Sequence, residues 1–423
     1  MTDRARGTRG YRDLLSVPSY GWLLGAVFLS RLGNAMSQVA VVIYLLERTG
    51  STAIAGMGAA AQLIPAVATG PLIGAWLDRV QARRPLIVWT QLVRAALLLA
   101  VVAVGELGSP PAALYIVLLA GLGLTFPLPN PGFRALVPVI VPRRLWDPAN
   151  ALDSISYDTA FVIGPALAAA IVTAAGAPLA IVAQAALTVL AALAAWRVRE
   201  PRGRPIAQEP VLAAAADGLR AVTGHPELRA TMALMMVSGI GFGALTIALP
   251  VWAQEQLGRS PGASGWMWAA LSAGSIAGAL LYGALRPKGS DARHAVAFAA
   301  VGGLPLLVLP FAPDLLVGML CMGVAGLATA PFVISMFAIR QRALPPELHG
   351  RAFAITVSIN VAGTPIGALL AGFLIGPIGV HSVLFLAGAG QLAAALAAEM
   401  VLRTSTLSDA AAASSRVVTR QTA

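Results

Sequence analysis

Gly74-Ala-Trp-Leu-Asp78-Arg79-Val-Gln-Ala-Arg83-Arg84-Pro85 is a short charged stretch that lies between two long apolar runs. The runs on either side, residues 53–77 and 86–105, are each close to the length that crosses about 30 Å of hydrocarbon as a helix. Charged residues at the membrane surface separate such spans. The stretch therefore predicts a chain that crosses a membrane, turns, and crosses it again.

The composition of the whole chain supports the same interpretation. Of 423 residues, 58% are hydrophobic and only 11% are charged, whereas a soluble chain carries about 25% charged residues. A water-soluble enzyme is excluded, because its surface needs far more charge than this. The single cysteine, Cys321, excludes an intrachain disulfide and a cysteine metal cluster.

Apolar segments of spanning length recur along the whole chain. The predicted spans are residues 20–45, 53–77, 86–105, 112–133, 149–175, 178–196, 228–252, 263–285, 294–312, 315–339, 351–375 and 380–402. In lipid every backbone amide needs an internal partner, and the alternation of a barrel strand is absent, so we expect helices. The predicted fold is an all-α integral membrane protein with twelve transmembrane helices in two pseudo-symmetric six-helix bundles. Its expected parts are a tail (1–19), a bundle (20–196), a linker (197–227), a second bundle (228–402) and a second tail (403–423).

The basic residues predict the orientation of the spans. The loops and tails on one side of the predicted membrane carry 25 of the 29 lysines and arginines, and those on the other side carry two. This bias predicts that both termini are cytoplasmic in a cell (inner) membrane. The net charge of +11 then reflects topology and does not indicate a nucleic-acid partner.

The two halves of the chain resemble each other. Residues 44–51 match residues 252–259, and Gly164-Pro165 matches Gly363-Thr-Pro365 about 200 positions later. Two helical halves in parallel repeat are typical of transporters that rock one bundle against the other around a midplane site.

The charged loop at 74–85 resembles the signature of the major facilitator superfamily between helices 2 and 3. The resemblance implies a gating role for Gly74, Asp78, Arg79, Arg83 and Arg84, with Asp78 docking near Arg351 at the start of helix 11. Gln81 stands where the signature has a second glycine.

A second motif, residues 160–169, resembles the antiporter signature of the same superfamily, and Gly164 and Pro165 match its central pair. Alanines replace its other glycines. The resemblance implies export rather than import. Residues 31–38, 127–131 and 351–354 are similar to the branch that holds macrolide-efflux and enterobactin-export proteins.

Ionisable residues inside spans are costly and are therefore functional candidates. Arg31, Arg94 and Asp158 lie at similar depths, about 12–16 Å at 1.5 Å per residue. We expect Asp158 to pair with Arg31 or Arg94 and to act as a proton switch; a static ion pair that orients helices is the alternative. Asp153 is interpreted as a helix-start charge.

Helices 1, 4, 7 and 10 line the central cavity in this superfamily, and helix 11 lies beside it. By position, the candidate lining residues are Asn34, Gln38, Phe242, Thr246, Phe332, Ser335, Met336 and Asn360. A mostly apolar wall with a few amides and aromatics suits bulky amphiphiles.

The sequence predicts a monomeric, proton-coupled exporter of an apolar or amphiphilic small molecule, without cofactor or metal. No phosphate-binding loop is present, because Lys288 is the only lysine and no glycine-rich motif precedes it. The alternatives are an importer or facilitator of a metabolite or lysolipid, and a membrane sensor that kept the fold without transport.

Overall fold

The computed structural model describes residues 12–80, 82–108, 110–200, 220, 223–285, 289–344 and 346–421. Within helices it describes only the backbone of residues 70–72, 74–79, 130–131, 135, 341, 346–358, 360 and 405–421. The N-terminal half contains α2 (Tyr20–Thr49), α3 (Thr52–Arg79), α4 (Arg83–Glu106), α5 (Ala112–Thr125), α6 (Pro129–Ile140) and α7 (Trp146–Trp196). The C-terminal half contains α9 (Pro226–Glu255), α10 (Ser264–Leu285), α11 (Asp291–Val308), α12 (Leu315–Ala343) and α13 (Pro346–Gln421).

Two of these helices each contain two membrane passes. The backbone of α7 leaves the helical conformation at Gly176 (φ 84°, ψ 164°), and that of α13 does so at Gly379 (φ 79°, ψ 158°). Both values lie in a region that only glycine adopts readily. Ala149 and Ala194 of α7 both pack beside the first turns of α2, so the chain reverses at Gly176. The two glycines lie at equivalent points of the two halves.

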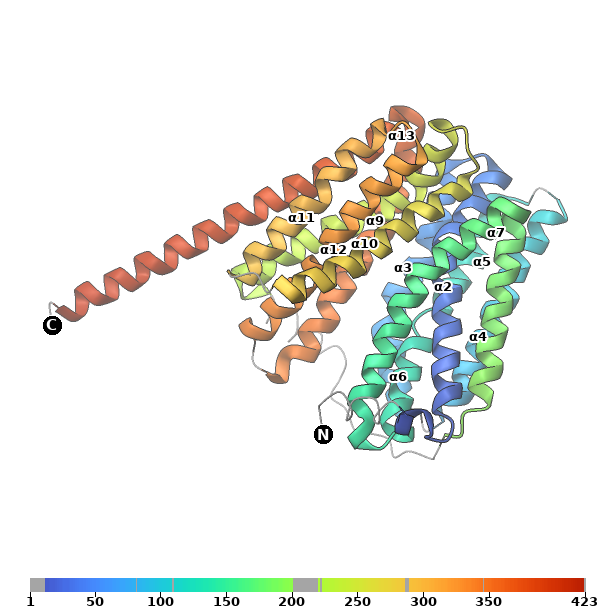
Figure 1. The fold of residues 1–423 in the computed structure, drawn as a ribbon, viewed down its shortest axis with the longest axis horizontal. Helices are drawn as coiled ribbons and strands as arrows, with labels where there is room; N and C mark the ends of the chain where they lie inside the picture. Colours follow the sequence, from blue (N-terminus) through green and yellow to red (C-terminus); the bar gives the residue numbers. More distant parts are fainter. Residues whose placement is uncertain are drawn as a thin grey trace.

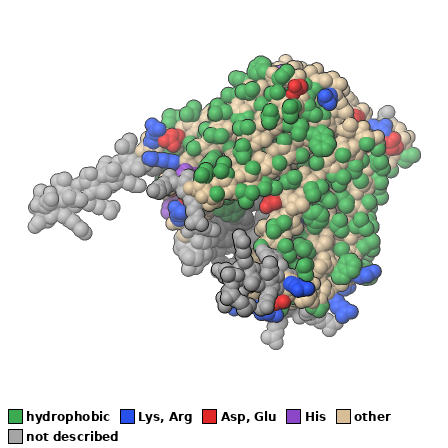
Figure 2. Space-filling model, viewed as in Figure 1, with side chains coloured by type: hydrophobic (Ala, Val, Ile, Leu, Met, Phe, Trp, Pro, Cys, Tyr) green, Lys and Arg blue, Asp and Glu red, His purple; other side chains and the backbone are tan. Residues whose placement is uncertain are grey.

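The prediction of an all-helical membrane fold with twelve spans is confirmed. In the part of the chain that the structure describes, nine helices are long and apolar enough to cross a membrane. α7 and α13 supply two passes each, and α5 and α6 together form another. Figure 1 shows the helices side by side in two groups, and Figure 2 shows a face covered by hydrophobic side chains with most charged ones toward its ends. A surface of this kind requires lipid around it.

The fourth pass is interrupted halfway. α5 ends at Thr125 and α6 begins at Pro129, after a turn at residues 126–128. Prolines at 127, 129 and 131 donate no backbone hydrogen bonds, so an unbroken helix is disfavoured here. The turn places an irregular backbone near the middle of this pass.

The packing of the two halves is repeated. A Cβ added to Gly164 of α7 would lie 2.5 Å from the Ala35 Cβ of α2, and one added to Gly363 of α13 would lie 2.5 Å from the Met236 carbonyl oxygen of α9. Glycine at both places therefore lets the fifth pass approach the first and the eleventh approach the seventh. The repeat seen in the sequence corresponds to one packing geometry used twice.

The two halves meet at one end of the molecule, which we call the seam end. There α3 contacts α13, and the Thr52 hydroxyl donates a hydrogen bond of 2.8 Å to the Gly372 carbonyl oxygen. A Cβ on Gly56 would lie 2.5 Å from the Ala368 carbonyl oxygen, so the two backbones are in close contact.

A second seam joins α7 to α10 at the same end. A Cβ on Gly265 would collide with Ala169 and lie 2.6 Å from the Pro165 carbonyl oxygen. In Figure 1 the halves converge at this end and diverge toward the opposite one, where α2 begins and α7 ends. We call the opposite end the mouth end; Figure 2 shows the surface hollowed between the halves there.

Candidate functional site: a cavity between the two halves

A cavity of about 610 Å³ lies between the two halves. Five of the predicted residues line it: Asn34, Gln38, Phe242, Thr246 and Phe332. They come from α2, α9 and α12, so both halves contribute to the wall. A volume of this size suits a drug-sized molecule.

Two other predicted lining residues are placed differently. Ser335 is fully buried, donates a hydrogen bond of 2.8 Å to the Pro331 carbonyl oxygen and lies 3.3 Å from the Tyr282 hydroxyl. Met336 packs in an apolar core cluster of the C-terminal half. Both are therefore helix-packing residues, because α12 turns Phe332 and Val333 toward the cavity instead. The side chain of Asn360 lies outside the described residues.

The cavity wall is mainly aromatic and aliphatic. Phe242 lies 4.8 Å from Trp268 between ring centres, and Tyr157 stacks on Phe161 at 4.6 Å. Phe126, at the break between α5 and α6, also lines the wall. Such a surface binds apolar groups of many shapes.

Sequence analysis missed two polar pairs in this wall. Ser37 donates a hydrogen bond of 3.0 Å to the Gln62 side chain, and Ser238 donates one of 2.9 Å to Gln391. All four residues line the cavity. Gln62 and Gln391 are isolated amides within apolar spans, and this signal could have identified them.

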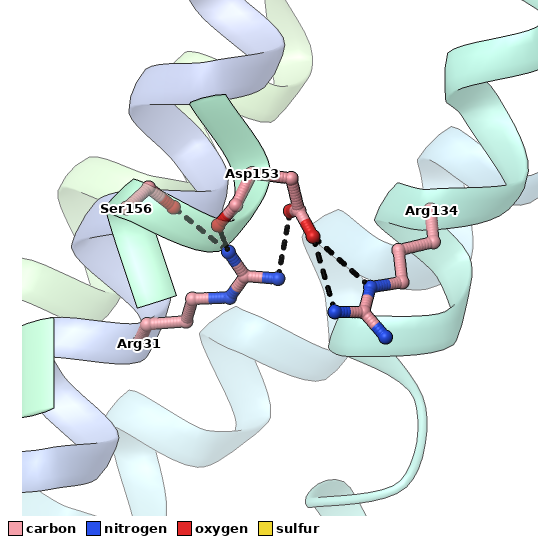
Figure 3. Close-up of polar contacts among 4 residues, drawn as sticks. All are labelled: Arg31, Arg134, Asp153 and Ser156. Atoms are coloured by element: carbon pink, nitrogen blue, oxygen red, sulfur yellow. Dashed lines mark hydrogen bonds and ion pairs between the residues drawn. The ribbon is translucent and has the colours of Figure 1, made fainter. Parts of the chain in front are cut away.

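Arg31 is at the centre of a polar network at the cavity wall, drawn in Figure 3. Its side chain is only 2% exposed; Nη2 lies 2.8 Å from Asp153 Oδ1, and Nη1 donates to the Asp153 carbonyl oxygen at 2.8 Å and to Ser156 Oγ at 2.7 Å. Arg134, which is 60% exposed, contacts the other Asp153 carboxylate oxygen at 3.1 Å. The guanidinium also lies over the Tyr157 ring, 5.3 Å from its centre.

The predicted pairing of Arg31 with Asp158 is wrong. Residues 153, 156 and 157 share the face of α7 that contacts α2, whereas Asp158 is rotated about 100° away from Tyr157. Asp153, which is half-buried, is thus the partner of Arg31, although the sequence favoured a helix-start charge there. In the part of the chain that the structure describes, Asp158 forms no ion pair.

Asp158 lies on the α7 face that leads to the second seam. One turn further along, the Phe161 carbonyl oxygen accepts a hydrogen bond of 3.2 Å from Ser272 of α10. Beyond it lie Pro165 and Ala169, which meet Gly265. The Asp158 side chain is exposed, so it lies just beyond the point where α7 and α10 separate toward the mouth end.

Arg94 of α4 also reaches the cavity. Its side chain is 3% exposed and lines the wall, and Nη1 has no hydrogen-bond partner. Arg94, a candidate that the sequence analysis named for its depth in the span, therefore lies in the cavity wall.

The gating motif is described only in part. The side chains of Gly74, Asp78 and Arg79 lie outside the described residues, as does Arg351, so the predicted docking of Asp78 stays a prediction. The backbone N–H groups of Arg83 and Arg84 donate to the Glu200 carboxylate at 2.9 and 2.8 Å. Glu200 therefore caps the start of α4, a role that its place in the predicted linker did not indicate.

The antiporter motif lies where three helices meet. Gly164 contacts α2, whereas the Pro165 carbonyl oxygen and Ala169 contact Gly265 of α10. One short stretch of α7 thus packs against its own half on one side and against the other half on the other. A change in this stretch would affect how the halves fit together.

Sequence comparison identifies relatives over almost the whole chain. Residues 14–422 match the family described as "Transmembrane secretion effector". The uncharacterized MFS-type transporter y4rN of Sinorhizobium fredii is 31% identical over 396 residues, which cover 92% of this chain and 96% of the relative. The multidrug efflux pump Tap of Mycolicibacterium fortuitum is 26% identical (85% and 90% covered), and macrolide efflux protein A of Streptococcus pyogenes is 23% identical (88% and 93% covered).

Solved structures share the fold at low identity. The nucleoside transporter NupG superposes with a TM-score of 0.73 at 14% identity, covering 90% of this chain and 98% of that one. A bacterial homologue of the human lysosomal transporter Spinster, inward-facing and occupied, superposes with a TM-score of 0.74 at 14% identity, covering 92% and 98%. These similarities confirm the architecture of two helical bundles.

Proposed function

The chain belongs to the transmembrane secretion effector family of the major facilitator superfamily, whose members are transporters and not enzymes, and from this premise we propose that it is a secondary active exporter of an apolar or amphiphilic small molecule. The observation that carries the proposal is the cavity of about 610 Å³ between the halves, lined by aromatic side chains and a few amides. The multidrug and macrolide pumps among the relatives support drugs or secondary metabolites as substrates.

Alternating access follows from how the halves are joined. They touch through the two seams at one end, where glycine and alanine backbones are in close contact and two hydrogen bonds, Thr52 to Gly372 and Ser272 to Phe161, join the halves. Opening these seams while closing the mouth end would move the cavity from one side of the membrane to the other. We place the chain in the cell (inner) membrane with both termini on the cytoplasmic side. The mouth end then faces the cytoplasm and receives the molecule to be exported. The transporter acts as a monomer.

A proton gradient drives this export in our proposal, with Asp158 as the group that takes up the proton. Asp158 is exposed beside the separating faces of α7 and α10. Closure of the mouth would remove water from this carboxylate, and a carboxylate that loses its water must find a cation or bind a proton. Protonation of Asp158 would thereby favour the state with the mouth closed.

The test uses everted membrane vesicles from a host that lacks its own drug pumps, with and without this chain. Three compounds differ in charge: N-phenyl-1-naphthylamine (neutral), 1-anilinonaphthalene-8-sulfonate (anionic) and erythromycin (cationic). We expect uptake of at least one, measured by filtration and mass spectrometry, when respiration acidifies the vesicle interior. An uncoupler should abolish it.

Variants separate the alternatives. Asp158→Asn should remove the gradient-driven uptake, whereas Arg48→Gln, which removes a surface charge paired with Glu106, should not. Uptake into intact cells alone would support an importer and refute export. Gradient-driven uptake that Asp158→Asn leaves unchanged would refute the assignment of the proton to Asp158.

A further inference from the structure

Arg94 is a buried cation without an anion beside it. It lies near the middle of α4, and its side chain is 3% exposed. In the described part of the chain the ion pairs are formed by other arginines, and Arg94 Nη1 has no hydrogen-bond partner of any kind. A guanidinium carries five N–H donors and loses its charge only at extreme pH, so burial demands acceptors for it.

Three amides of the same half are also incompletely paired. Gln91 lies one turn before it on the same face of α4, and neither polar atom of its side chain has a partner. Gln184, on the part of α7 that packs against α4, is likewise unpartnered at both atoms. The Oδ1 atom of Asn34 has no partner either. Gln91 and Gln184 are fully buried.

Gln184 and Asn34 come from neighbouring positions of α7 and α2. A Cβ on Gly33 would lie 3.5 Å from the Gln184 carbonyl oxygen and 3.7 Å from Gln184 Cγ, so Gln184 packs beside the residue that precedes Asn34. Asn34 and Arg94 both line the cavity. Asn34 and Arg94 therefore reach the cavity wall, whereas Gln91 and Gln184 are fully buried and are not among the residues that line it.

The contrast with Arg31 shows that this arrangement is not the usual one for a structural arginine. Arg31 is equally buried, but it has a carboxylate, a hydroxyl and a backbone carbonyl within 2.8 Å. The same half of the protein thus contains one arginine that is bound by a carboxylate, a hydroxyl and a carbonyl group and another that lines the cavity and has an unpaired Nη1.

We propose that Arg94 and Asn34, which both line the cavity, form a subsite for the acidic group of the transported molecule, which makes an acidic amphiphile the preferred substrate class. A carboxylate, sulfonate or phosphate group accepts hydrogen bonds from the guanidinium and from amide N–H groups together. The apolar body of the molecule then contacts the aromatic wall, including Phe126, Phe242 and Phe332. This inference rests on the proposed function, because it assigns the substrate of the same cavity.

The test compares two dyes with the same carbon skeleton. 1-Anilinonaphthalene-8-sulfonate carries a sulfonate, and N-phenyl-1-naphthylamine lacks it. Binding of each is measured by equilibrium dialysis against the purified full-length protein in phosphatidylcholine nanodiscs, with protein-free nanodiscs subtracted. No gradient is needed, so binding is measured independently of transport.

We expect Arg94→Gln to raise the Kd of the sulfonate dye at least about tenfold, as loss of a charged hydrogen bond does, and to change that of the neutral dye less than about twofold. Arg94→Lys should bind the sulfonate dye better than Arg94→Gln. Gln91→Glu, which gives Arg94 an anion within reach, should weaken sulfonate binding while keeping the arginine. Arg48→Gln is the matched control for loss of one positive charge.

Equal weakening of both dyes in Arg94→Gln, or unchanged sulfonate binding in Gln91→Glu, would overturn the subsite. A second comparison replaces gluconate by chloride as the buffer anion in the binding assay. If chloride weakens binding of the sulfonate dye to the wild type but not to Arg94→Gln, the subsite is supported and inorganic anions also bind there. Gradient-driven uptake without Arg94-dependent binding would refute the subsite and leave the exporter standing. Arg94-dependent binding without gradient-driven uptake would refute the exporter and leave the subsite standing.

Discussion

The Arg31–Asp153 pair predicts how much the free energy of unfolding changes when either residue is replaced, and which replacement costs more. Asp153→Asn leaves Arg31 charged, 2% exposed and without its carboxylate. Breaking a buried pair in this way costs about 3–5 kcal/mol of the free energy of unfolding. Arg31→Met instead removes the buried charge and leaves Asp153, which is 18% exposed and retains Arg134. Lost hydrogen bonds then cost about 1–3 kcal/mol.

The double variant is the decisive measurement. Once Arg31 is methionine, Asp153→Asn no longer strands a buried cation, so Asp153→Asn/Arg31→Met should be more stable than Asp153→Asn alone, with a coupling energy of about 2–3 kcal/mol. Arg134 is 60% exposed and contributes less than about 1 kcal/mol, which does not change this order.

The assay is reversible unfolding by SDS in mixed micelles, followed by tryptophan fluorescence. Asp158→Asn serves as the control, because Asp158 is exposed and should change the free energy of unfolding by no more than about 0.5 kcal/mol. Additive effects in the double variant, or a loss in Asp158→Asn as large as in Asp153→Asn, would refute the assignment of Asp153 as the partner of Arg31.

Three further changes test the packing and the seams. Gly367→Val should destabilise by about 1–3 kcal/mol in the same assay, because its Cβ would collide with the α9 backbone, whereas Gly376→Val, with no atom within 4 Å of its Cβ, should cost less. Thr52→Val removes the hydrogen bond to Gly372 and should shift the seam equilibrium by about 1 kcal/mol toward opening, measured by thiol labelling of a seam cysteine in a Cys321→Ala background. Glu200→Gln should lower stability by about 1 kcal/mol, because a neutral amide accepts more weakly from the first N–H groups of α4; unchanged thermal unfolding would exclude Glu200 as a cap.

The spans could be predicted from the sequence because hydropathy acts over a whole segment. Even the reversal at Gly176 lies between two predicted spans, since a glycine two residues before Pro178 interrupts a helix. The face of each helix that points toward the interior was harder to predict. Counting along the span gave Asp158 a depth suitable for pairing with Arg31. Depth does not define how α7 is rotated about its axis, and the partner of Arg31 is Asp153, five residues earlier.

The same difficulty explains the cavity residues. Phe332 and Ser335 are three positions apart on α12, and only the first lines the cavity, because the rotation of α12 depends on its contacts with α10 and α11. Residues that act through the backbone, such as Glu200 on the first N–H groups of α4, carry no sequence signal of their own. Tertiary packing determines both features.

Three ionisable groups of the N-terminal half, Arg31, Asp158 and Arg94, have different surroundings, and this difference separates their roles. Arg31 is bound by groups of its own half, so its pair joins α2 to α7 without depending on how the halves are placed. A group can bias alternating access only if its surroundings differ between the two states. Asp158, beside the separating faces of α7 and α10, satisfies that condition in our proposal, and Arg94 does so through the molecule it binds in the shared cavity. Proton and substrate then act at separate residues, and their coupling passes through the movement of the halves rather than through competition for one side chain.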